Sequence, residues 1–297
     1  MTGRSGDTPD RQEGTSPDPD GGTAGPLLEL KGVCATYDRA ARSRGRGLSG
    51  ARMRHPGEPV MAVRNASLVI QRGESVGVVG ESGSGKTTLG NCAVGLIPLA
   101  AGEILYEGRP ASVAGRRPAF PRVRGVQVVY QDPHSALNPR RRIGSLINEV
   151  LLVHRMAPRS KVDDRCSELL DQVGLSSSIK SRRPRELSGG MCQRVAIARA
   201  LAFEPRILVA DEIVSALDAS VQAQVLNLLV ELRVRTGIAI MLITHDLAVV
   251  NQDCDRVVVM HDGEIVETGA TADVLRQPQH SYTISLLEAV PHIEKIT

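Results

Sequence analysis

A glycine-rich stretch has the composition and spacing of a phosphate-binding loop. Gly80 to Thr87 has the sequence GESGSGKT and fits the pattern G-x-x-x-x-G-K-[ST] without a mismatch. Its glycines allow backbone N–H groups to point inward at an anion, and the N-terminus of a following helix adds a positive partial charge. Lys86 can reach the β- and γ-phosphates of a nucleotide, and the Thr87 hydroxyl can be a ligand of Mg²⁺.

The alternative for this stretch is a Gly/Ser-rich turn with a solvated lysine, and the flanking sequence favours the phosphate loop. Val76 to Val79 is a short β-branched run that predicts a buried strand, and residues 88–96 predict a helix. Strand, loop and helix in this order are the context that the motif requires. The residues predicted to bind the nucleotide are Gly80, Glu81, Ser82, Gly83, Ser84, Gly85, Lys86, Thr87 and Thr88.

A second apolar run ends in two carboxylates. Asp211 and Glu212 directly follow the predicted strand at 207–210. Ligands of open α/β sheets bind beyond the carboxyl ends of the strands, so Asp211 is placed to position Mg²⁺. Glu212 faces the other way and is a candidate general base for an attacking water. Two ordinary acids at a turn are the alternative, and the pair by itself does not decide between the two interpretations.

Composition and charge argue against several other classes of protein. The 297 residues are 41% hydrophobic with a net charge of +3, a balance that favours a globular protein and does not favour nucleic acid as a partner. Arginines cluster at 140–142 and 182–183, where solvated faces are the better-supported interpretation. The five cysteines form no C-x-x-C, which predicts neither a zinc or iron–sulfur site nor a disulfide framework. A helix that spans a membrane needs about 20 consecutive apolar residues, and no run in this sequence is that long. A cytoplasmic protein is therefore expected.

Strands and helices alternate along most of the chain, which predicts an α/β fold with a mostly parallel sheet covered on both faces. Residues 27–37 and 60–70 predict two strands of an antiparallel layer in front of this sheet. Amphipathic helices predicted at 143–155 and 162–173 indicate a helical subdomain inserted at about 131–185. The remaining predicted elements are strands at 102–106, 126–130, 238–243 and 257–260, and helices at 195–201, 221–234 and 273–290.

Further elements occur in an order that is typical of one protein family. Leu187-Ser188-Gly189-Gly190 has the composition of a signature motif, and Ser215-Ala216-Leu217-Asp218 that of the D-loop after a Walker B strand. His245 is placed like a switch histidine, Gln131 like a Q-loop glutamine, and Tyr37 like an aromatic residue that stacks on adenine. Together with the phosphate loop and the acidic pair, these elements resemble the ATP-binding subunits of ABC transporters.

The resemblance implies a role for each element. Ser188 would donate its hydroxyl to the γ-phosphate of a nucleotide held by the opposite subunit, so that two subunits sandwich two ATP molecules. Neutral His245 would hydrogen-bond the γ-phosphate and hold the attacking water. Gln131 would contact both Mg²⁺ and water, and Tyr37 would contact adenine. Taken singly, each residue has an ordinary structural alternative. Ser188 could cap a helix, and His245 could be a histidine with its hydrogen bonds satisfied within the fold. Gln131 could lie in a polar turn, and Tyr37 could belong to the core.

The resemblance covers residues 27–290, preceded by a tail at 1–26 whose Gly, Pro, Ser, Thr and Asp content predicts disorder, and followed by a short tail at 291–297. It implies a P-loop NTPase (RecA-like) core that uses ATP and Mg²⁺. Two departures stand out: Met191 replaces the usual Gln of the signature, and Ile213-Val214 replaces the usual Pro-Thr after the acidic pair. We expect a competent ATP hydrolase, with affinity or rate reduced where Met191 cannot make the polar contacts of Gln.

Three longer stretches of the sequence narrow the resemblance to the ATPases of oligopeptide/dipeptide importers. Related importers of the same branch carry nickel and other small solutes. Residues 131–140 (QDPHSALNPR), 218–226 (DASVQAQVL) and the ending from Tyr282-Thr283 to Pro291 are similar to stretches of that branch. This implies a peripheral subunit on the cytoplasmic face of the membrane, paired with a second ABC ATPase subunit, identical or different. Its other partners would be two transmembrane permeases and an extracytoplasmic solute-binding protein. The alternatives are an exporter ATPase and a low-turnover nucleotide-gated clamp.

Overall fold

The computed structural model describes residues 25–37, 60–115 and 125–289 of the chain. The predicted tails at 1–26 and 291–297 therefore fall almost entirely outside the described residues. So do residues 38–59, whose Arg, Gly and Ser content predicts an exposed loop.

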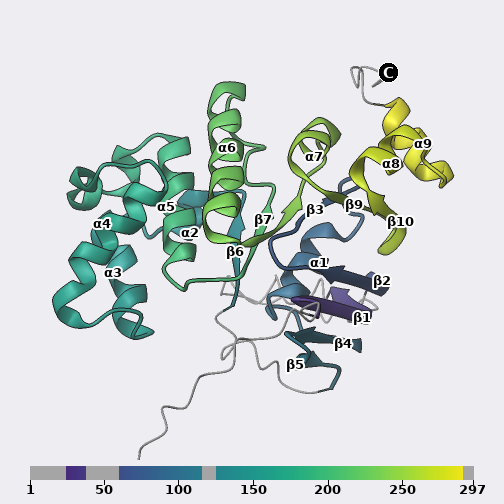
Figure 1. Ribbon diagram of the computed structural model, residues 1–297, viewed down its shortest axis with the longest axis horizontal. Coiled ribbons are helices and arrows are strands. Elements are labelled where there is room, and N and C mark those ends of the chain that lie inside the picture. Colours follow the sequence, from purple (N-terminus) through teal and green to yellow (C-terminus); the bar gives the residue numbers. More distant parts are fainter. Residues whose placement is uncertain (1–24, 38–59, 116–124, 290–297) are drawn as a thin grey trace, which may run out of the picture.

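The larger of two sheets has six strands in the order β10-β9-β3-β8-β7-β6 (Figure 1). All neighbouring pairs are parallel except that of β10 with β9, so the prediction of a mostly parallel sheet is confirmed. Its strands are β3 (Ser75–Val79), β6 (Val126–Tyr130), β7 (Ile207–Asp211), β8 (Ala239–Ile243), β9 (Arg256–His261) and β10 (Glu264–Ala270).

The smaller sheet has four antiparallel strands in the order β2-β1-β4-β5, as the predicted antiparallel layer required. Helix α1 (Lys86–Ala93) lies between the two sheets and contacts strands of both. A hydrophobic cluster that includes Leu89 and Ala93 of α1 fills this space. The strands of the sheet are β1 (Leu28–Tyr37), β2 (Val60–Ile70), β4 (Ala101–Tyr106) and β5 (Arg109–Val113).

The opposite face of the six-stranded sheet is covered by helices, and a group of helices extends to the side of β6 (Figure 1). Within this group, α5 contacts α3 and α4 as well as α6 and β6, so it joins the helical subdomain to the core. The α-helices are α2 (Pro133–Ala136), α3 (Ile143–Val153), α4 (Val162–Gln172), α5 (Gly189–Leu201), α6 (Ala219–Thr236), α7 (Leu247–Asp253), α8 (Thr271–Arg276) and α9 (Ser281–Glu288), and the 3₁₀ helices are η3 (Arg159–Lys161), η4 (Ser177–Ser181) and η5 (Pro184–Glu186).

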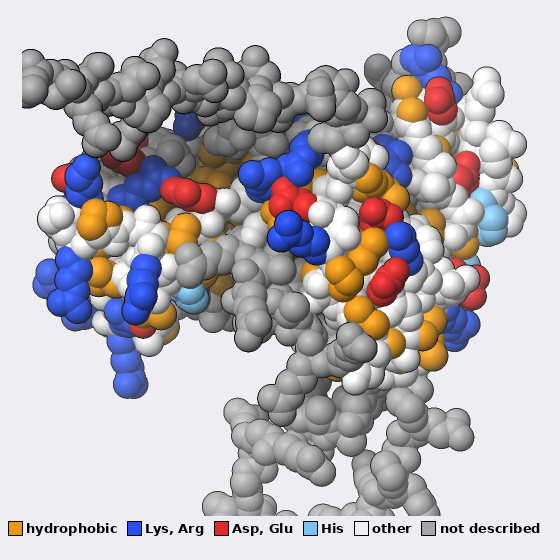
Figure 2. All heavy atoms as spheres, turned by 60° about the horizontal axis from the view of Figure 1, so that its bottom comes forward, with side chains coloured by type: hydrophobic (Ala, Val, Ile, Leu, Met, Phe, Trp, Pro, Cys, Tyr) orange, Lys and Arg blue, Asp and Glu red, His pale blue; other side chains and the backbone are white. Residues whose placement is uncertain are grey.

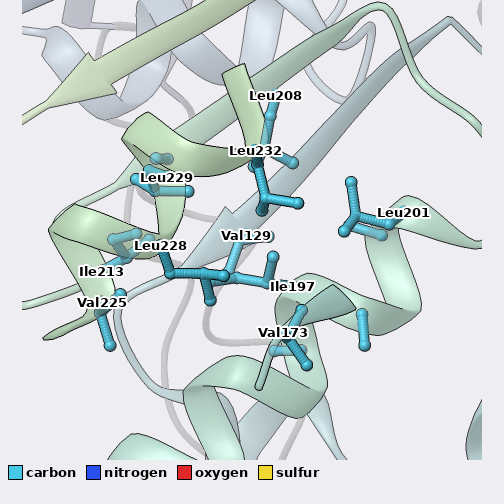
Figure 3. Packing of buried hydrophobic residues seen from close by; sticks show 14 of the residues in the cluster. Val129, Val173, Ile197, Leu201, Leu208, Ile213, Val225, Leu228, Leu229 and Leu232 are labelled. Atoms are coloured by element: carbon cyan, nitrogen blue, oxygen red, sulfur yellow. The ribbon is translucent and has the colours of Figure 1, made fainter. Parts of the chain in front are cut away.

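Strand β8 shows how one run of residues belongs to two cores. Successive side chains of a strand point to opposite faces of the sheet. Met241 and Ile243 belong to the cluster around α1, whereas Ile240 and Leu242 belong to the cluster under the other helices. Figure 3 shows part of the second cluster, in which residues of α6 and α5 gather over β6 and β7. An unbroken apolar run is therefore required here, because both faces of the sheet are covered.

Strands β5 and β10, and helices α2 and α7, were not predicted from the sequence. Two of these omissions have a recognisable signal. Asp262 and Gly263 have φ angles of 47° and 86°, and Glu107 and Gly108 have 50° and 72°. Positive φ at both central residues defines the type I′ turn, which matches the twist of a two-residue hairpin. Each dipeptide thus predicts a hairpin, in which the strand before it is followed by an antiparallel partner strand.

Some of the charged side chains on the surface of the helical subdomain form ion pairs. Figure 2 shows Lys and Arg side chains over these helices, at the left of the view, with acidic and hydrophobic side chains among them. Arg141 pairs with Glu149, and Lys180 pairs with Asp163 at 2.7 Å. Such exposed pairs contribute little to stability, about 0–1 kcal/mol each. Arg140 and Arg142 are exposed, which agrees with the interpretation of the arginine cluster at 140–142 as a solvated face.

Two adjacent leucines of α3 test the packing of the helical subdomain. Leu151 is fully buried and Leu152 is 43% exposed. We expect Leu151→Ala to lower the free energy of unfolding by about 2–5 kcal/mol, because it leaves a cavity, and Leu152→Ala to change it by less than about 0.5 kcal/mol. Urea unfolding of the two variants measures the difference. Equal destabilisation would contradict the packing described here.

Candidate functional site

The loop after β3 lies so close to neighbouring backbone that two of its positions accept only glycine. Gly80 has a φ of 147°, and a Cβ there would lie 2.1 Å from the carbonyl oxygen of Met260. Gly85 has a φ of 102°, and a Cβ there would lie 2.3 Å from the carbonyl oxygen of Ala62. Ser84 is buried, and its Oγ has no hydrogen-bond partner. A buried hydroxyl without a partner is costly, and a phosphate oxygen would satisfy it.

Lys86 is the first residue of α1 and is held inside the loop. Its Nζ donates to the carbonyl oxygens of Gly80 and Glu81, both at 2.7 Å, and the residue is 5% exposed. Burial lowers the pKa of the ammonium, whereas the negative charges of Glu212, Asp211 and Glu81 raise it. The cation therefore lies within electrostatic reach of the acidic pair.

Thr87 and Asp211 come together from α1 and the end of β7, as the sequence predicts for two ligands of one cation. The Thr87 Oγ1 donates to Asp211 Oδ1 at 3.1 Å. Burial raises the pKa of Asp211; the Thr87 hydrogen bond lowers it, Glu212 raises it and Lys86 lowers it. Hydroxyl and carboxylate oxygens are the donors that Mg²⁺ prefers, so these residues fit that ion. A cavity of about 330 Å³ beside them is lined by Thr87, Tyr130, Gln131, Asp132, Asp211 and Glu212.

Glu212 has an uncommon backbone conformation, with a φ of 48°. Its N–H donates to the carbonyl oxygen of Ile243 at 2.9 Å, and its own carbonyl accepts from the N–H and Oγ of Ser215 at 3.2 and 2.9 Å. A left-handed conformation in a residue other than glycine costs free energy and needs such support. The result is a carboxylate whose Oε1 lies 3.6 Å from Nδ1 of His245, which follows β8 and is 63% exposed.

The position of Gln131 is fixed by contacts of the residue before it. The Tyr130 hydroxyl donates to Asn91 Oδ1 of α1 at 2.8 Å, and the Tyr130 carbonyl accepts from Gln193 Nε2 of α5 at 3.2 Å. Gln131 itself is exposed and lines the cavity beside Asp211. The sequence analysis missed Asn91 and Gln193. No local pattern in the sequence points to either residue; the structure shows Gln193 as a fully buried polar residue on a helix whose other buried residues are mostly apolar.

The signature and the D-loop lie at the N-termini of α5 and α6. Ser188 caps α5 by accepting from the N–H of Met191 at 3.3 Å, and Asp218 caps α6 by accepting from the N–H of Val221 at 3.0 Å. A Cβ on Gly190 would lie 2.2 Å from Val221 Cγ1, so the two helix ends pack closely. Among the described residues, no hydrogen bond joins residues 187–190 to the phosphate loop.

The turn that leads from Glu212 to the D-loop is closed despite its unusual composition. Ile213 and Val214 are 1% and 4% exposed and belong to the core under the helices. Figure 3 shows Ile213 in this core. The Leu217 N–H donates to the Val214 carbonyl at 3.0 Å. Met191 is partly buried and packs against the same core. The two apolar side chains at 213 and 214 thus contribute buried surface to this turn.

Tyr37 is the last residue of β1 and is paired with Val60 of β2. Its side chain is outside the described part of the chain, so its contact with adenine stays a prediction.

The comparison with known proteins agrees with this geometry. The family model described as ABC transporter matches residues 63–215. The chain belongs to the ABC transporter family. A Brucella abortus protein named "Putative peptide import ATP-binding protein" is 47% identical over 235 residues, which cover 79% of this chain and 70% of the relative. A Brucella ovis protein of the same description is 40% identical over 269 residues, which cover 91% and 80%.

Solved ABC structures share the fold. The structure of cbiO1 from Clostridium perfringens, part of the ABC transporter complex cbiONQ, has a TM-score of 0.68 at 26% identity and covers 85% of this chain and 91% of its own. A dimeric ATP-binding cassette in a post-hydrolysis state with ADP and Pi has a TM-score of 0.67 at 27% identity, covering 82% and 99%. The P-loop NTPase fold is thus confirmed, and the chain is an ATP hydrolase of the ABC type. Within the described ranges, no helix has the length and apolar character needed to cross a membrane.

Two glycines of the loop test how tightly it is packed. Gly80 and Gly83 both have positive φ, but a Cβ on Gly83 would meet nothing within 4 Å. We expect Gly80→Ala to destabilise the nucleotide-free protein by about 2 kcal/mol or more, and Gly83→Ala by about 1 kcal/mol, since only the first adds a clash to the strain. Chemical denaturation of both variants measures this, and equal losses would be inconsistent with the close contact to Met260.

Proposed function

We propose that this ABC-type ATPase hydrolyses ATP to drive the import of a peptide or a related small solute through partner permeases. The observation that carries the proposal is the convergence of Lys86, Thr87, Asp211, Glu212 and His245 at the carboxyl ends of three adjacent strands. The relatives named as peptide import ATP-binding proteins support the transport direction and the class of solute.

Nucleotide binding follows from the groups that the loop leaves unsatisfied. Residues 80–88 surround the phosphates, and Lys86 exchanges the carbonyls of Gly80 and Glu81 for phosphate oxygens. The Ser84 hydroxyl gains the partner that it lacks. Thr87, Asp211 and Gln131 would hold Mg²⁺, which neutralises charge on the phosphates when it is bound. Tyr37 would stack on adenine.

Hydrolysis requires a base and a group that holds the water. Glu212 accepts a proton from the attacking water, and its supported left-handed backbone fixes the carboxylate at the end of β7. His245, 3.6 Å from that carboxylate, holds the γ-phosphate and the water. Gln131 lines the same cavity and completes the set.

A second ATPase subunit, identical or different, would complete the site. His245, Ser215, Ala216 and Asp218 are exposed in the single chain. In the part of the chain that the structure describes, the signature 187–190 forms no hydrogen bond with the chain's own phosphate loop. These groups would contact the nucleotide and the loops of the partner, with Ser188 donating to the partner's γ-phosphate and residues 215–218 lying between the two sites. The dimeric ATP-binding cassette among the structural neighbours supports this arrangement.

The other partners follow from the same family. We expect two permeases, an extracytoplasmic solute-binding protein and a peripheral position on the cytoplasmic face of the membrane. An exporter subunit and a low-turnover clamp are less well supported, because the named relatives are import proteins and the hydrolytic residues are all present.

The base is tested by Glu212→Gln, which keeps the size of the side chain and removes its charge. We expect ATP hydrolysis by the assembled transporter to fall roughly 10²–10⁴-fold while ATP binding is retained. Glu264→Gln, which changes an exposed carboxylate on β10, serves as the control and should leave the rate unchanged. Equal hydrolysis by wild type and Glu212→Gln would favour the clamp.

The partners are tested by purifying the tagged chain from its native membranes in a mild detergent and identifying the proteins that accompany it. We expect two permeases, a second ATPase or a second copy of this chain, and a solute-binding protein. Permeases without a solute-binding protein would favour an exporter, and a protein without any membrane partner would contradict transport.

A further inference from the structure

The C-terminal helix α9 reaches the start of the phosphate loop. The N–H of Glu81 donates to the hydroxyl of Tyr282 at 2.9 Å, although the two residues are 201 positions apart. In the sequence, Tyr282 stands out only as part of the C-terminal stretch that resembles peptide importers. That resemblance gives Tyr282 no role in nucleotide binding.

This hydrogen bond holds one end of a peptide group whose other end holds Lys86. The N–H of Glu81 and the carbonyl of Gly80 belong to the same peptide unit, and that carbonyl accepts from Lys86 Nζ at 2.7 Å. Because a trans peptide unit is planar, its N–H and C=O point in opposite directions. The Tyr282 hydroxyl therefore fixes the direction in which the Gly80 carbonyl faces.

The Tyr282 ring is itself anchored without help from the loop. It stacks on the His261 ring at the end of β9, with centroids 3.9 Å apart and planes 27° from parallel. The helix that carries it is held to β10, since the carboxylate of Glu267 accepts from the N–H groups of Gln279 and His280 at 2.8 and 3.0 Å. His280 Nδ1 then caps the helix by accepting from the Tyr282 N–H at 3.2 Å. The hydroxyl is thus a fixed point against which the loop can be positioned.

We propose that Tyr282 is a positioning residue for nucleotide binding, whose hydroxyl holds the Gly80–Glu81 peptide in the orientation that the loop needs around a phosphate. This inference rests on the proposed ATP binding by the loop. When Lys86 turns from the Gly80 carbonyl to phosphate oxygens, the Tyr282 hydrogen bond keeps the peptide from rotating. The loop is then preorganised, and less conformational freedom is lost when ATP binds.

Tyr282→Phe tests the proposal because it removes the hydroxyl and keeps the ring that stacks on His261. With the purified full-length chain and a fluorescent ATP derivative, we expect Kd to rise about fivefold, the effect of one lost hydrogen bond. In the assembled transporter, KM for ATP should rise by a similar factor while kcat changes less than about twofold, since the hydroxyl does not contact reacting atoms. Hydrogen exchange of the amides in residues 80–85 should accelerate.

Ser285→Ala is the matched control. This substitution also removes one hydroxyl from α9. The Ser285 Oγ donates to the Ser281 carbonyl at 3.2 Å and makes no described contact with the loop. We expect its Kd, KM and loop exchange to equal those of wild type. If Tyr282→Phe also matches wild type in all three, Tyr282 only packs α9 against the sheet and the proposal is overturned. Failure of the wild-type chain to bind the ATP derivative would instead contradict the proposed function.

Discussion

Parallel pairing of β3, β8 and β7 is the constraint on which the site depends. Val78 is in register with Ile243, and Ile243 is in register with Asp211. The phosphate loop, the residues that follow β8, and the acidic pair therefore leave the sheet at the same edge. The pairing requires strands buried on both faces, which is why these segments are unbroken apolar runs that end abruptly in polar residues.

The site that results is electrostatically unfinished in the protein alone. Lys86 is held by carbonyls of its own loop, the Ser84 hydroxyl has no partner, and burial raises the pKa of Asp211. A bound phosphate would accept hydrogen bonds from the lysine and the serine, and a bound divalent cation would stabilise the charged carboxylate. In the proposed function, part of the affinity for Mg·ATP would come from these groups, which folding buries without fully satisfying.

Polar contacts between elements link this edge to the rest of the molecule. Gln193 connects the helix of the signature to the residue before Gln131, and Asn91 connects the helix of the phosphate loop to the same residue. Besides the packing of α5 on α6 and β6, the short segment at the end of β6 therefore links the helical subdomain to the nucleotide site. Gln131 lines the cavity and follows directly on β6, so in the proposed function it would carry a change at the γ-phosphate of bound ATP to these helices.

The sequence alone determined most of the elements and the residue types that the site contains. The phosphate loop, the acidic pair, the buried strands and the family order all depend on patterns within a few residues, and backbone sterics and side-chain periodicity act at that range. The Asp262-Gly263 and Glu107-Gly108 turns show that even β5 and β10 had a local signal. Only the tertiary structure decided the left-handed conformation of Glu212, the contacts of Tyr130 and the reach of Tyr282 to Glu81. Each of these joins residues far apart in the chain, and their meeting depends on how sheets and helices pack, which no local pattern specifies.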